Sequence, residues 1–428
     1  MGGVSMEWKE VRLGDVCEIK HGFAYKGKYF SDTPTCDILV TPGNFTLSGG
    51  FKLDKPKFYN GPVEKDYILS KGDLIVTMTD LSKNIDTLGY SALVPEVKGL
   101  TFHHNQRIGL VENIANNVDK YFLYWIMRTP AYQSFIATHS SGTTVHHTSP
   151  KGIGNYIFKL PPLDDQRRIA SILSSLDRKI ELNNKINAGL EEMAQAIFKN
   201  WFVDFEPFKD GKFVDSELGM IPEGWKVSQI ADIPHILETG KRPKGGAVEK
   251  GIPSVGAEHV KGMCAYDYSK NKYINCEFAA KLKTGKINGY ELMIYKDGGK
   301  PGYFIPNFSI FGEGYPFENC YLNEHVFKLD FDGDKGYNIF CYFFFKTEQI
   351  MNYFNAQGAK AAIPGINKKD VENIYMFSPD NEFVIKFGEF AYPLFKQMLK
   401  NAKANRTLSL LRDTLLPRLM SGEIEVPE

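Results

Sequence analysis

Two polar loops carry side chains suited to contacts with a nucleic acid. The loop from His139 to Gly152, HSSGTTVHHTSPKG, aligns with the segment from Asn355 to Lys369, NAQGAKAAIPGINKK. Lysine pairs with phosphates, while hydroxyl, imidazole and amide groups form hydrogen bonds with base edges. Glycine allows a close backbone approach. Contact with a nucleic acid is therefore one interpretation of these loops, and an ordinary solvated surface loop is the other.

Three further pairs of aligned segments have similar chemistry. KHGFAYKGKYF (Lys20 to Phe30) aligns with TGKRPKGG (Thr239 to Gly246), TDLSKN (Thr79 to Asn84) with KDGGKPG (Lys296 to Gly302), and HHNQR (His103 to Arg107) with YLNEH (Tyr321 to His325). The first pair is basic and glycine-rich, and its alternative is a solvated turn. In the third pair, Asn105 and Asn323 either contact a ligand or are buried structural residues.

The sequence lacks the motifs that would give this chain its own chemistry. There is no G-x-x-x-x-G-K-[ST] loop for ATP, since ETGKRPKGG lacks the first glycine and the final hydroxyl residue. Neither an N-P-P-Y type methyltransferase motif, nor an assembled P-D…E-x-K nuclease pattern, nor G-x-S-x-G is present. We therefore expect a recognition module without catalysis.

The aligned segments belong to a repeat that runs along the whole chain. Trp8 matches Trp225, and the numbering of the two tryptophans differs by 217 (225 − 8). GDLIVTMTD (from Gly72) matches YELMIYKDG (from Tyr290), GNYIFKLPP (from Gly154) matches ENIYMFSPD (from Glu372), and NNKINAGL (from Asn183) matches NAKANRTL (from Asn401). In these three pairs the offset in numbering is 218 (for example, 372 − 154). A nearly constant offset indicates a duplication, and we call this offset the repeat length.

Each repeat begins with a region of mixed α+β character. Short β-type runs such as CDILVTP, DLIVTMT, ELMIYK and YFIPNFSIF are broken by glycine, proline and asparagine. Helical patterns cover 118–136 and 337–354. The abundant aromatic residues fit core packing better than stacking on single-stranded bases.

Each repeat ends with a heptad pattern typical of a long helix and a coiled coil. The positions of the first pattern are Ile169, Leu176, Asn183, Leu190 and Ile197, with Leu173, Ile180, Asn187, Ala194 and Trp201. Those of the second are Phe387, Leu394, Asn401, Leu408 and Leu415, with Ala391, Met398, Asn405, Arg412 and Leu419. Pro161 and Pro162 precede the first helix, and Pro417 is expected to end or kink the second.

Asparagine occupies the two middle layers of both patterns. A buried asparagine costs stability but fixes register and orientation. Only antiparallel pairing brings the middle of one helix against the middle of the other, so we expect Asn183 and Asn187 to meet Asn401 and Asn405. The alternative is that each helix packs on its own domain. About 35 residues at about 1.5 Å each would give a rod of roughly 50 Å, with the two globular domains at its opposite ends.

The composition sets further limits. At 428 residues and 43% apolar content the chain can form two or three globular domains. It has no apolar run long enough to span a membrane and no signal peptide, so we expect a cytoplasmic location. Six scattered cysteines predict reduced, mostly buried thiols rather than disulfides or a metal site. The net charge of zero argues against an isolated high-affinity DNA binder, although not against a DNA reader within a complex.

The order of two variable regions and two long helices closely resembles the DNA specificity subunit of type I restriction–modification systems. The resemblance covers the whole chain and rests on P-L-x-x-Q-x-x-I (Pro162 to Ile169), F-x-x-W-F-V-D-F (Phe198 to Phe205), P-x-G-W (Pro222 to Trp225) and L-L-P-x-L-M-S-G (Leu415 to Gly422). It implies target recognition domains at 1–162 and 207–380, and conserved helices at 163–206 and 381–428 that pair antiparallel.

The resemblance also implies a function. Each recognition domain would read one half of a bipartite, asymmetric site in double-stranded DNA, and the helices would set the spacer between the halves. The helices would dock two methyltransferase subunits, and restriction and translocase subunits would join them. This chain would bind no cofactor, whereas its partners would use S-adenosylmethionine, ATP and Mg²⁺. The C-terminal segment from Ser421 would return to the first domain. The alternative is a solo tandem scaffold without cognate subunits.

On this basis we predict the residues that contact DNA. In the first domain they are Lys26, Lys28, Lys83, Arg107, Thr143, Thr144, His146, His147 and Lys151. In the second domain they are Lys241, Arg242, Lys244, Lys300, Lys360, Lys368 and Lys369. Asn183, Asn187, Asn401 and Asn405 are predicted to set the register of the helices.

Overall fold

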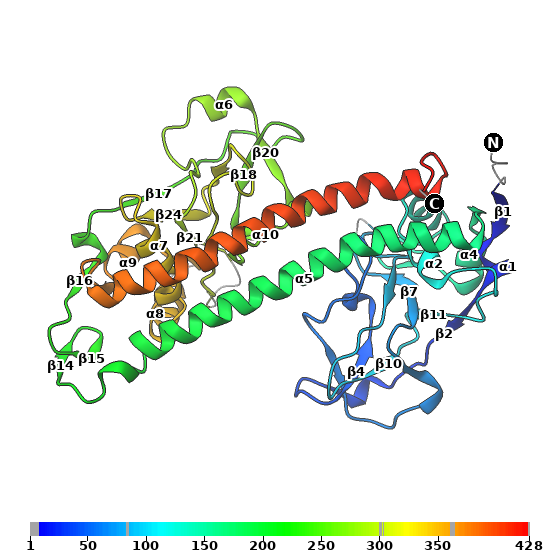
Figure 1. The fold of residues 1–428 in the computed structure, drawn as a ribbon, viewed down its shortest axis with the longest axis horizontal. Coiled ribbons are helices and arrows are strands. Elements are labelled where there is room, and N and C mark those ends of the chain that lie inside the picture. Colours follow the sequence, from blue (N-terminus) through cyan, green and yellow to red (C-terminus); the bar gives the residue numbers. More distant parts are fainter. Residues whose placement is uncertain (1–7, 83–84, 299–301, 303, 360–363, 427–428) are drawn as a thin grey trace. The chain divides into compact units, whose positions relative to one another are not determined.

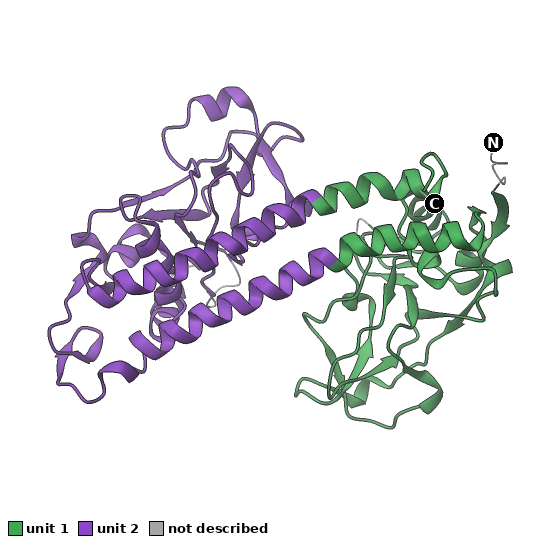
Figure 2. Ribbon diagram, in the orientation of Figure 1, with its two compact units in different colours: residues 1–178, 408–428 green, residues 179–407 purple. Residues whose placement is uncertain are grey.

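A computed structural model of the chain divides into two compact units. Unit 1 comprises Met1–Arg178 and Leu408–Glu428, and unit 2 comprises Lys179–Thr407 (Figure 2). The residues that the structure describes are 8–82, 85–298, 302, 304–359 and 364–426. Among them, no helix has the length and apolar character needed to cross a membrane. Both units combine strands and helices, so the predicted α+β class is confirmed.

Unit 1 is built on two sheets (Figure 1). A four-stranded antiparallel sheet has the order β2 (Glu18–His21), β11 (Ile108–Glu112), β7 (Leu74–Thr77), β9 (Ser91–Leu93). A five-stranded sheet has the order β3 (Phe30–Ser31), β5 (Lys57–Tyr59), β4 (Asp37–Val40), β10 (Thr101–His104), β6 (Ile68–Leu69). Two short pairs join β1 (Lys9–Arg12) to β13 (Ile157–Leu160) and β8 (Thr79–Asp80) to β12 (His146–His147). The short helices are α1 (Leu13–Val16), α2 (Lys120–Ile126), α3 (Pro130–Thr138) and α4 (Pro150–Gly154).

Unit 2 follows the same plan. Its five-stranded sheet has the order β17 (Ile236–Thr239), β24 (Val326–Asp330), β21 (Leu292–Tyr295), β22 (Phe308–Ile310), β19 (Gly262–Met263). Its three-stranded sheet has the order β20 (Lys272–Ile274), β18 (Ile252–Val255), β23 (Tyr321–Leu322). Two further pairs are β14 (Phe213–Ser216) with β15 (Gly219–Pro222), and β16 (Val227–Gln229) with β25 (Tyr375–Phe377). The short helices are α6 (Cys276–Ala280), α7 (Lys335–Phe345), α8 (Glu348–Gly358) and α9 (Lys368–Glu372).

The repeat is visible in the register of the strands. Ile19 lies opposite Val111 in the sheet of unit 1, and Leu237 lies opposite Leu329 in unit 2. Both partners are displaced by one repeat length, which confirms the duplication. Each predicted helical stretch contains two short helices. The side chain of Thr129 caps α3, and its repeat counterpart Thr347 stands at the N-cap position of α8 without a side-chain capping bond.

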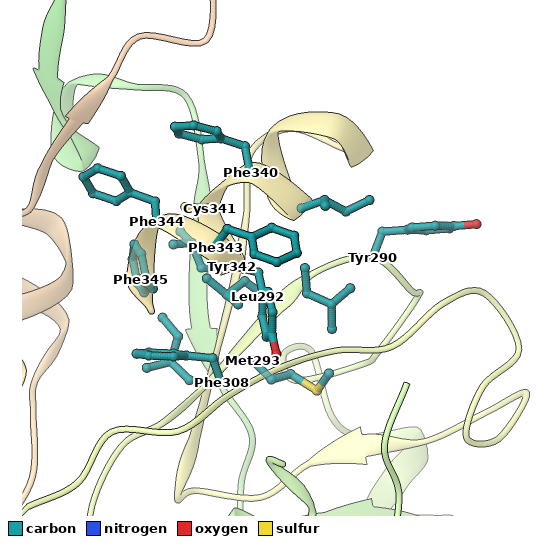
Figure 3. Close-up of a cluster of buried hydrophobic side chains, with 14 of the residues drawn as sticks. Tyr290, Leu292, Met293, Phe308, Phe340, Cys341, Tyr342, Phe343, Phe344 and Phe345 are labelled. Atoms are coloured by element: carbon teal, nitrogen blue, oxygen red, sulfur yellow. The ribbon is translucent and has the colours of Figure 1, made fainter. Parts of the chain in front are cut away.

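The core of unit 2 surrounds α7. Every residue of this helix from Tyr337 to Phe345 is buried, as expected for a helix inside a domain. Phe340, Phe343 and Phe345 are fully buried, and the ring of Phe345 lies 5.5 Å from that of Phe308 in β22 (Figure 3). The rings of Phe340 and Phe343 instead pack against Phe198, at 5.4 and 6.0 Å. Asp334 caps α7, because its side chain accepts a hydrogen bond from the backbone N–H of Tyr337.

The two long helices contribute to both units. Helix α5 (Leu163–Phe202) has 40 residues and α10 (Glu382–Met420) has 39. None of the predicted heptad positions is exposed. Pro417 is expected from the sequence to end or kink the second helix; an end there is wrong, because α10 continues to Met420. Pro417 is exposed in the last turn, where water can satisfy the lost backbone contact, while Leu416, Leu419 and Met420 are buried in the core of unit 1.

The C-terminal segment and the cysteines both lie where they were predicted: the segment on the first domain, and most of the thiols buried. The C-terminal segment lies on unit 1: Ile424 and Val426 pack against its core, and Gly422 lies against Trp8. All six cysteines are free, and four of them are buried: Cys17, Cys264, Cys320 and Cys341.

Candidate nucleic-acid interface

In unit 1, four predicted contact segments meet at one end of the four-stranded sheet, where β2 and β7 end and β11 begins. The N–H of Gln106 donates to the carbonyl of Phe23 at 2.9 Å, and the N–H of Met78 donates to that of Arg107 at 2.9 Å. The N–H of Thr148 donates to the carbonyl of Met78 at 3.0 Å. These bonds tie together residues 21–23, 78–82, 105–107 and 141–148, which we call the unit 1 edge.

A glycine and a buried asparagine shape this edge. A Cβ atom at Gly22 would lie 2.1 Å from the carbonyl oxygen of Asn105, so only glycine fits there. The side-chain oxygen of Asn105 accepts the N–H of Arg107 at 3.1 Å. In unit 2, the side-chain oxygen of Asn323 accepts the N–H of His325 at 2.9 Å. Both asparagines therefore use their side-chain oxygens to shape a turn. Asn105 is buried, as the structural interpretation expects, whereas Asn323 is half-buried.

The loop from His139 to Gly152 is attached to the neighbouring segment by the short strand pair β8 and β12. His146 lies opposite Asp80, and His147 lies opposite Thr79, whose hydroxyl is 3.1 Å from Nδ1 of His147. Thr143, Thr144 and His147 are exposed, whereas His146 is half-buried. Lys151, in the same loop, is exposed as well, so the loop presents four of its five predicted contact residues to solvent.

Asp80 organises the neighbouring loop from the inside. It is 2% exposed, and its carboxylate accepts hydrogen bonds from the N–H of Ser82 at 2.6 Å and of Leu88 at 3.0 Å. Burial by itself raises the pKa of Asp80, but the hydrogen bonds from Ser82 and Thr87 outweigh it and hold the pKa below its usual value. The carboxylate is therefore charged at neutral pH and serves to fix the loop.

The other predicted contacts of unit 1 are exposed but lie on different elements. Lys26 and Lys28 flank the turn after β2, and Lys28 lies over the ring of Tyr29 at 4.8 Å. Arg107 is exposed at the unit 1 edge, and Lys151 is exposed on α4. Lys83 lies outside the described residues.

Unit 2 has an equivalent edge that shares two backbone bonds with the unit 1 edge. The N–H of Lys296 donates to the carbonyl of His325 at 2.9 Å, and the N–H of Ile366 donates to that of Lys296 at 2.8 Å. The N–H of Gly240 donates to the carbonyl of Asn323 at 3.2 Å. The first two bonds repeat those of Met78 and Thr148 one repeat length later. We call residues 239–242, 296–298, 323–325 and 364–366 the unit 2 edge.

The side chains on the two edges differ in chemistry. At the unit 2 edge, Glu324 lies 3.6 Å from Arg242 and 3.2 Å from His325. Asp297 hydrogen-bonds to Nδ1 of His325 and lies 3.6 Å from Lys296. The carboxylates thus lie between three basic groups. The corresponding positions of unit 1 hold Met78, Thr79, Gln106 and Arg107, which include no carboxylate.

The remaining predicted contacts of unit 2 are also on its surface. Lys241, Lys244, Lys368 and Lys369 are exposed, and Lys368 lies 3.4 Å from Glu372 within α9. Lys300 and Lys360 lie outside the described residues. Sequence reasoning did not select Lys296 and His325 as contact residues, although both belong to the aligned segments.

The four predicted asparagines of the long helices meet within unit 2. Nδ2 of Asn183 donates to Asn405 at 2.7 Å, and Nδ2 of Asn401 donates to Asn187 at 2.8 Å. Nδ2 of Asn187 also donates to the carbonyl of Met398 at 3.1 Å. Because the earlier asparagine of α5 pairs with the later one of α10, and the later with the earlier, this part of the pair is antiparallel.

In each unit, a carboxylate of α5 accepts hydrogen bonds from side chains of the same unit. The heptad pattern did not reveal these two carboxylates. In unit 1, Asp177 of α5 accepts from Arg128 at 2.9 Å and from Arg412 of α10 at 2.7 Å. In unit 2, Glu191 of α5 accepts from Lys346 at 2.8 Å and from the hydroxyl of Tyr342 at 2.7 Å. Lys346 is the repeat counterpart of Arg128, so the position is basic in both units.

Large apolar side chains remain exposed on α5 within unit 2. Leu182 is 51% exposed, Ile186 39% and Met193 51%. Leu182 and Ile186 are four positions apart and therefore lie on one face of the helix. Exposed apolar residues at helical spacing can form a docking surface for a partner.

Comparisons with known proteins point to one family. A family profile described as "Type I restriction modification DNA specificity domain" matches residues 6–192. The chain is 31% identical over 314 residues to the type I restriction enzyme MjaIX specificity subunit of Methanocaldococcus jannaschii, which covers 72% of this chain and 69% of that protein. It is 27% identical over 489 residues to the HindI specificity subunit of Haemophilus influenzae, covering 98% and 100% of the two chains. The solved S subunit of a type I system from M. genitalium matches with a TM-score of 0.57 at 14% identity, over 98% of each chain, which supports the fold.

Proposed function

This chain belongs to the family of type I restriction enzyme specificity subunits, and we propose that it reads a two-part DNA sequence for partner subunits that carry out the chemistry. Unit 1 would read one half of the site and unit 2 the other. The chain itself would neither cleave nor methylate DNA, and it would act in the cytoplasm.

The observation that carries this proposal is the pair of edges. Both have the same backbone framework, since the bonds of Met78 and Lys296 to Arg107 and His325 are equivalent. A shared framework with different side chains is what two readers of different half-sites need, because the donors and acceptors on base edges determine which sequence is bound. Exposed basic groups nearby, such as Lys241 and Lys26, would supply the contacts with phosphates.

The long helices would connect recognition to the partners. The antiparallel asparagine contacts would fix the register of the pair and thereby the number of unread base pairs between the half-sites. The exposed apolar face at Leu182, Ile186 and Met193 offers a surface for a methyltransferase subunit. Two such subunits would dock, and restriction and translocase subunits would join them. S-adenosylmethionine, ATP and Mg²⁺ would be bound by these partners.

Methylome sequencing of the host with and without this gene tests the proposal. We expect methylated adenines at a single bipartite, asymmetric sequence, present only when the gene is present. The proposal would be contradicted if the chain assembled with modification subunits and no bipartite sequence were methylated. That result would favour a scaffold without a role in DNA recognition.

A further inference from the structure

Two lysine-bearing loops of unit 2 are packed against each other. A Cβ atom at Gly285, where φ is +81°, would lie 2.6 Å from the Cα of Gly240, so glycine is required for this approach. The hydroxyl of Thr284 donates to the carbonyl of Thr239 at 3.2 Å. The contact places 281–286 beside the loop that begins at Gly240.

The two loops together carry five exposed lysines, which we call the lysine ridge. The ridge consists of Lys241, Lys244, Lys281, Lys283 and Lys286. Arg242 also lies in the first loop, but it is 3.6 Å from Glu324 and is not counted in the ridge. Five positive charges on neighbouring loops create a local field that favours an anionic ligand, although the whole chain has no net charge.

A buried lysine beneath the ridge holds its second loop in place. Lys328 is 6% exposed, and its Nζ donates to the carbonyl of Lys286 at 2.9 Å. The same ammonium lies 3.0 Å from Glu238, whose carboxylate also accepts the N–H of Gly285 at 2.9 Å. The backbone of the ridge is therefore anchored to the sheet, while its lysine side chains remain in solvent.

Unit 1 has fewer lysines at the positions that correspond to the ridge. The two units can be compared position by position here. Lys286 forms a β-bridge with Tyr321 in unit 2, and Ile68 pairs with His103 in unit 1, with both residues one repeat length earlier. The positions that correspond to the ridge are, in order, Phe23, Lys26, Val63, Lys65 and Ile68. Unit 1 thus has two lysines where unit 2 has five.

We propose that the lysine ridge binds the phosphates of duplex DNA and makes unit 2 the stronger electrostatic anchor of the two recognition units. The inference rests on the proposed function and adds an asymmetry to it. The ridge adjoins the unit 2 edge, since Lys241 follows Gly240, whose N–H donates to the carbonyl of Asn323 at 3.2 Å. Phosphates next to bases read by that edge would therefore lie within its reach.

The salt dependence of binding measures this contribution directly. Each phosphate neutralised by a lysine adds about 0.9 to the slope of log K against log salt, whatever the DNA sequence. We would measure binding of the full chain to a random-sequence duplex over a range of salt concentrations. Changing Lys281, Lys283 and Lys286 together to glutamine should lower the magnitude of the slope by about 2 to 3.

A matched variant removes the same charge from elsewhere on unit 2. Lys212, Lys396 and Lys400 are exposed and lie outside the ridge, so their combined change to glutamine should leave the slope nearly unchanged. Circular dichroism and thermal melting of both triple variants check that the fold is retained. An equal change of slope in both variants would overturn the inference, as would no change in either.

Two further outcomes are distinguishable. If the ridge variant kept its slope but no longer assembled with partner subunits, the inference would be overturned and the ridge assigned to an acidic protein surface. If the chain assembled with its modification subunits bound no duplex even at low salt, the proposed function itself would be contradicted.

Discussion

The ion pairs of Asp177 offer a sharp test of how unit 1 holds the long helices. Asp177 bridges Arg128, whose side chain is 3% exposed, and Arg412, whose side chain is 12% exposed. We predict that Asp177→Asn destabilises unit 1 strongly, because the change keeps the shape of the side chain but leaves two largely buried guanidinium groups without their shared countercharge.

The expected magnitude follows from the burial. Loss of one partner of a buried ion pair costs about 3–5 kcal/mol. Arg128 retains its bond to the carbonyl of Ser48 at 2.8 Å and its position over the ring of Trp125 at 4.3 Å, and Asp177 is 27% exposed. We therefore expect about 2–4 kcal/mol. For a unit of roughly 200 residues this corresponds to a fall in Tm of about 4–15 °C.

Scanning calorimetry of the full chain provides the assay, and Asp413→Asn provides the control. Asp413 lies 2.7 Å from the same Arg412, but its side chain is 58% exposed. Exposed ion pairs contribute little, so this variant should melt within about 1–2 °C of the unmodified chain. Equal melting temperatures for the two variants would refute the argument that burial makes Asp177 important.

Three further predictions concern single residues elsewhere in the chain. Asn401→Ala should lower the free energy of unfolding by about 1–3 kcal/mol, because the side-chain oxygen of Asn187 loses the donor that now lies 2.8 Å away. Urea unfolding measures this change, and an unchanged free energy would show that the amide of Asn401 does not stabilise the fold. Burial lowers the pKa of His104 to about 4, so the unfolded chain takes up a proton below about pH 6.5 that the folded chain does not. Stability should therefore fall by up to about 3 kcal/mol between pH 6.5 and 4, and His104→Leu should flatten that part of the profile; an identical profile would exclude His104 as its source. Gly22→Ala should disrupt the unit 1 edge, since the added Cβ would meet the oxygen of Asn105 at 2.1 Å, and unchanged amide exchange of Arg107 would contradict this.

The repeat and the helices could be predicted from the sequence because their signals are periodic. A constant offset in numbering survives divergence of individual side chains, and the register of Ile19 with Val111 and of Leu237 with Leu329 preserves it. The heptad positions likewise depend only on local spacing. The end of α10 was harder, because the effect of Pro417 depends on its exposure in the last turn and on the burial of Leu416 beside it.

The candidate interface could be predicted only in part. Composition identified the polar loops, but their assembly depends on long-range bonds such as that between Met78 and Arg107. The lysines at 281–286 were missed because their importance follows from the contact of Gly285 with Gly240, which no local pattern reveals. Asp177 was missed for a similar reason, since a carboxylate outside the apolar heptad positions gives no sign of a buried partner.

The central claim is that each edge reads its own half of one DNA sequence. The most direct measurement is the methylome of hosts that carry one of two variants, in which Arg107 and His147, or Arg242 and His325, are changed to alanine. We predict that the first variant relaxes the methylated sequence in one half only and that the second relaxes the other half only. Changes in the same half, or in both halves at once, would contradict the account.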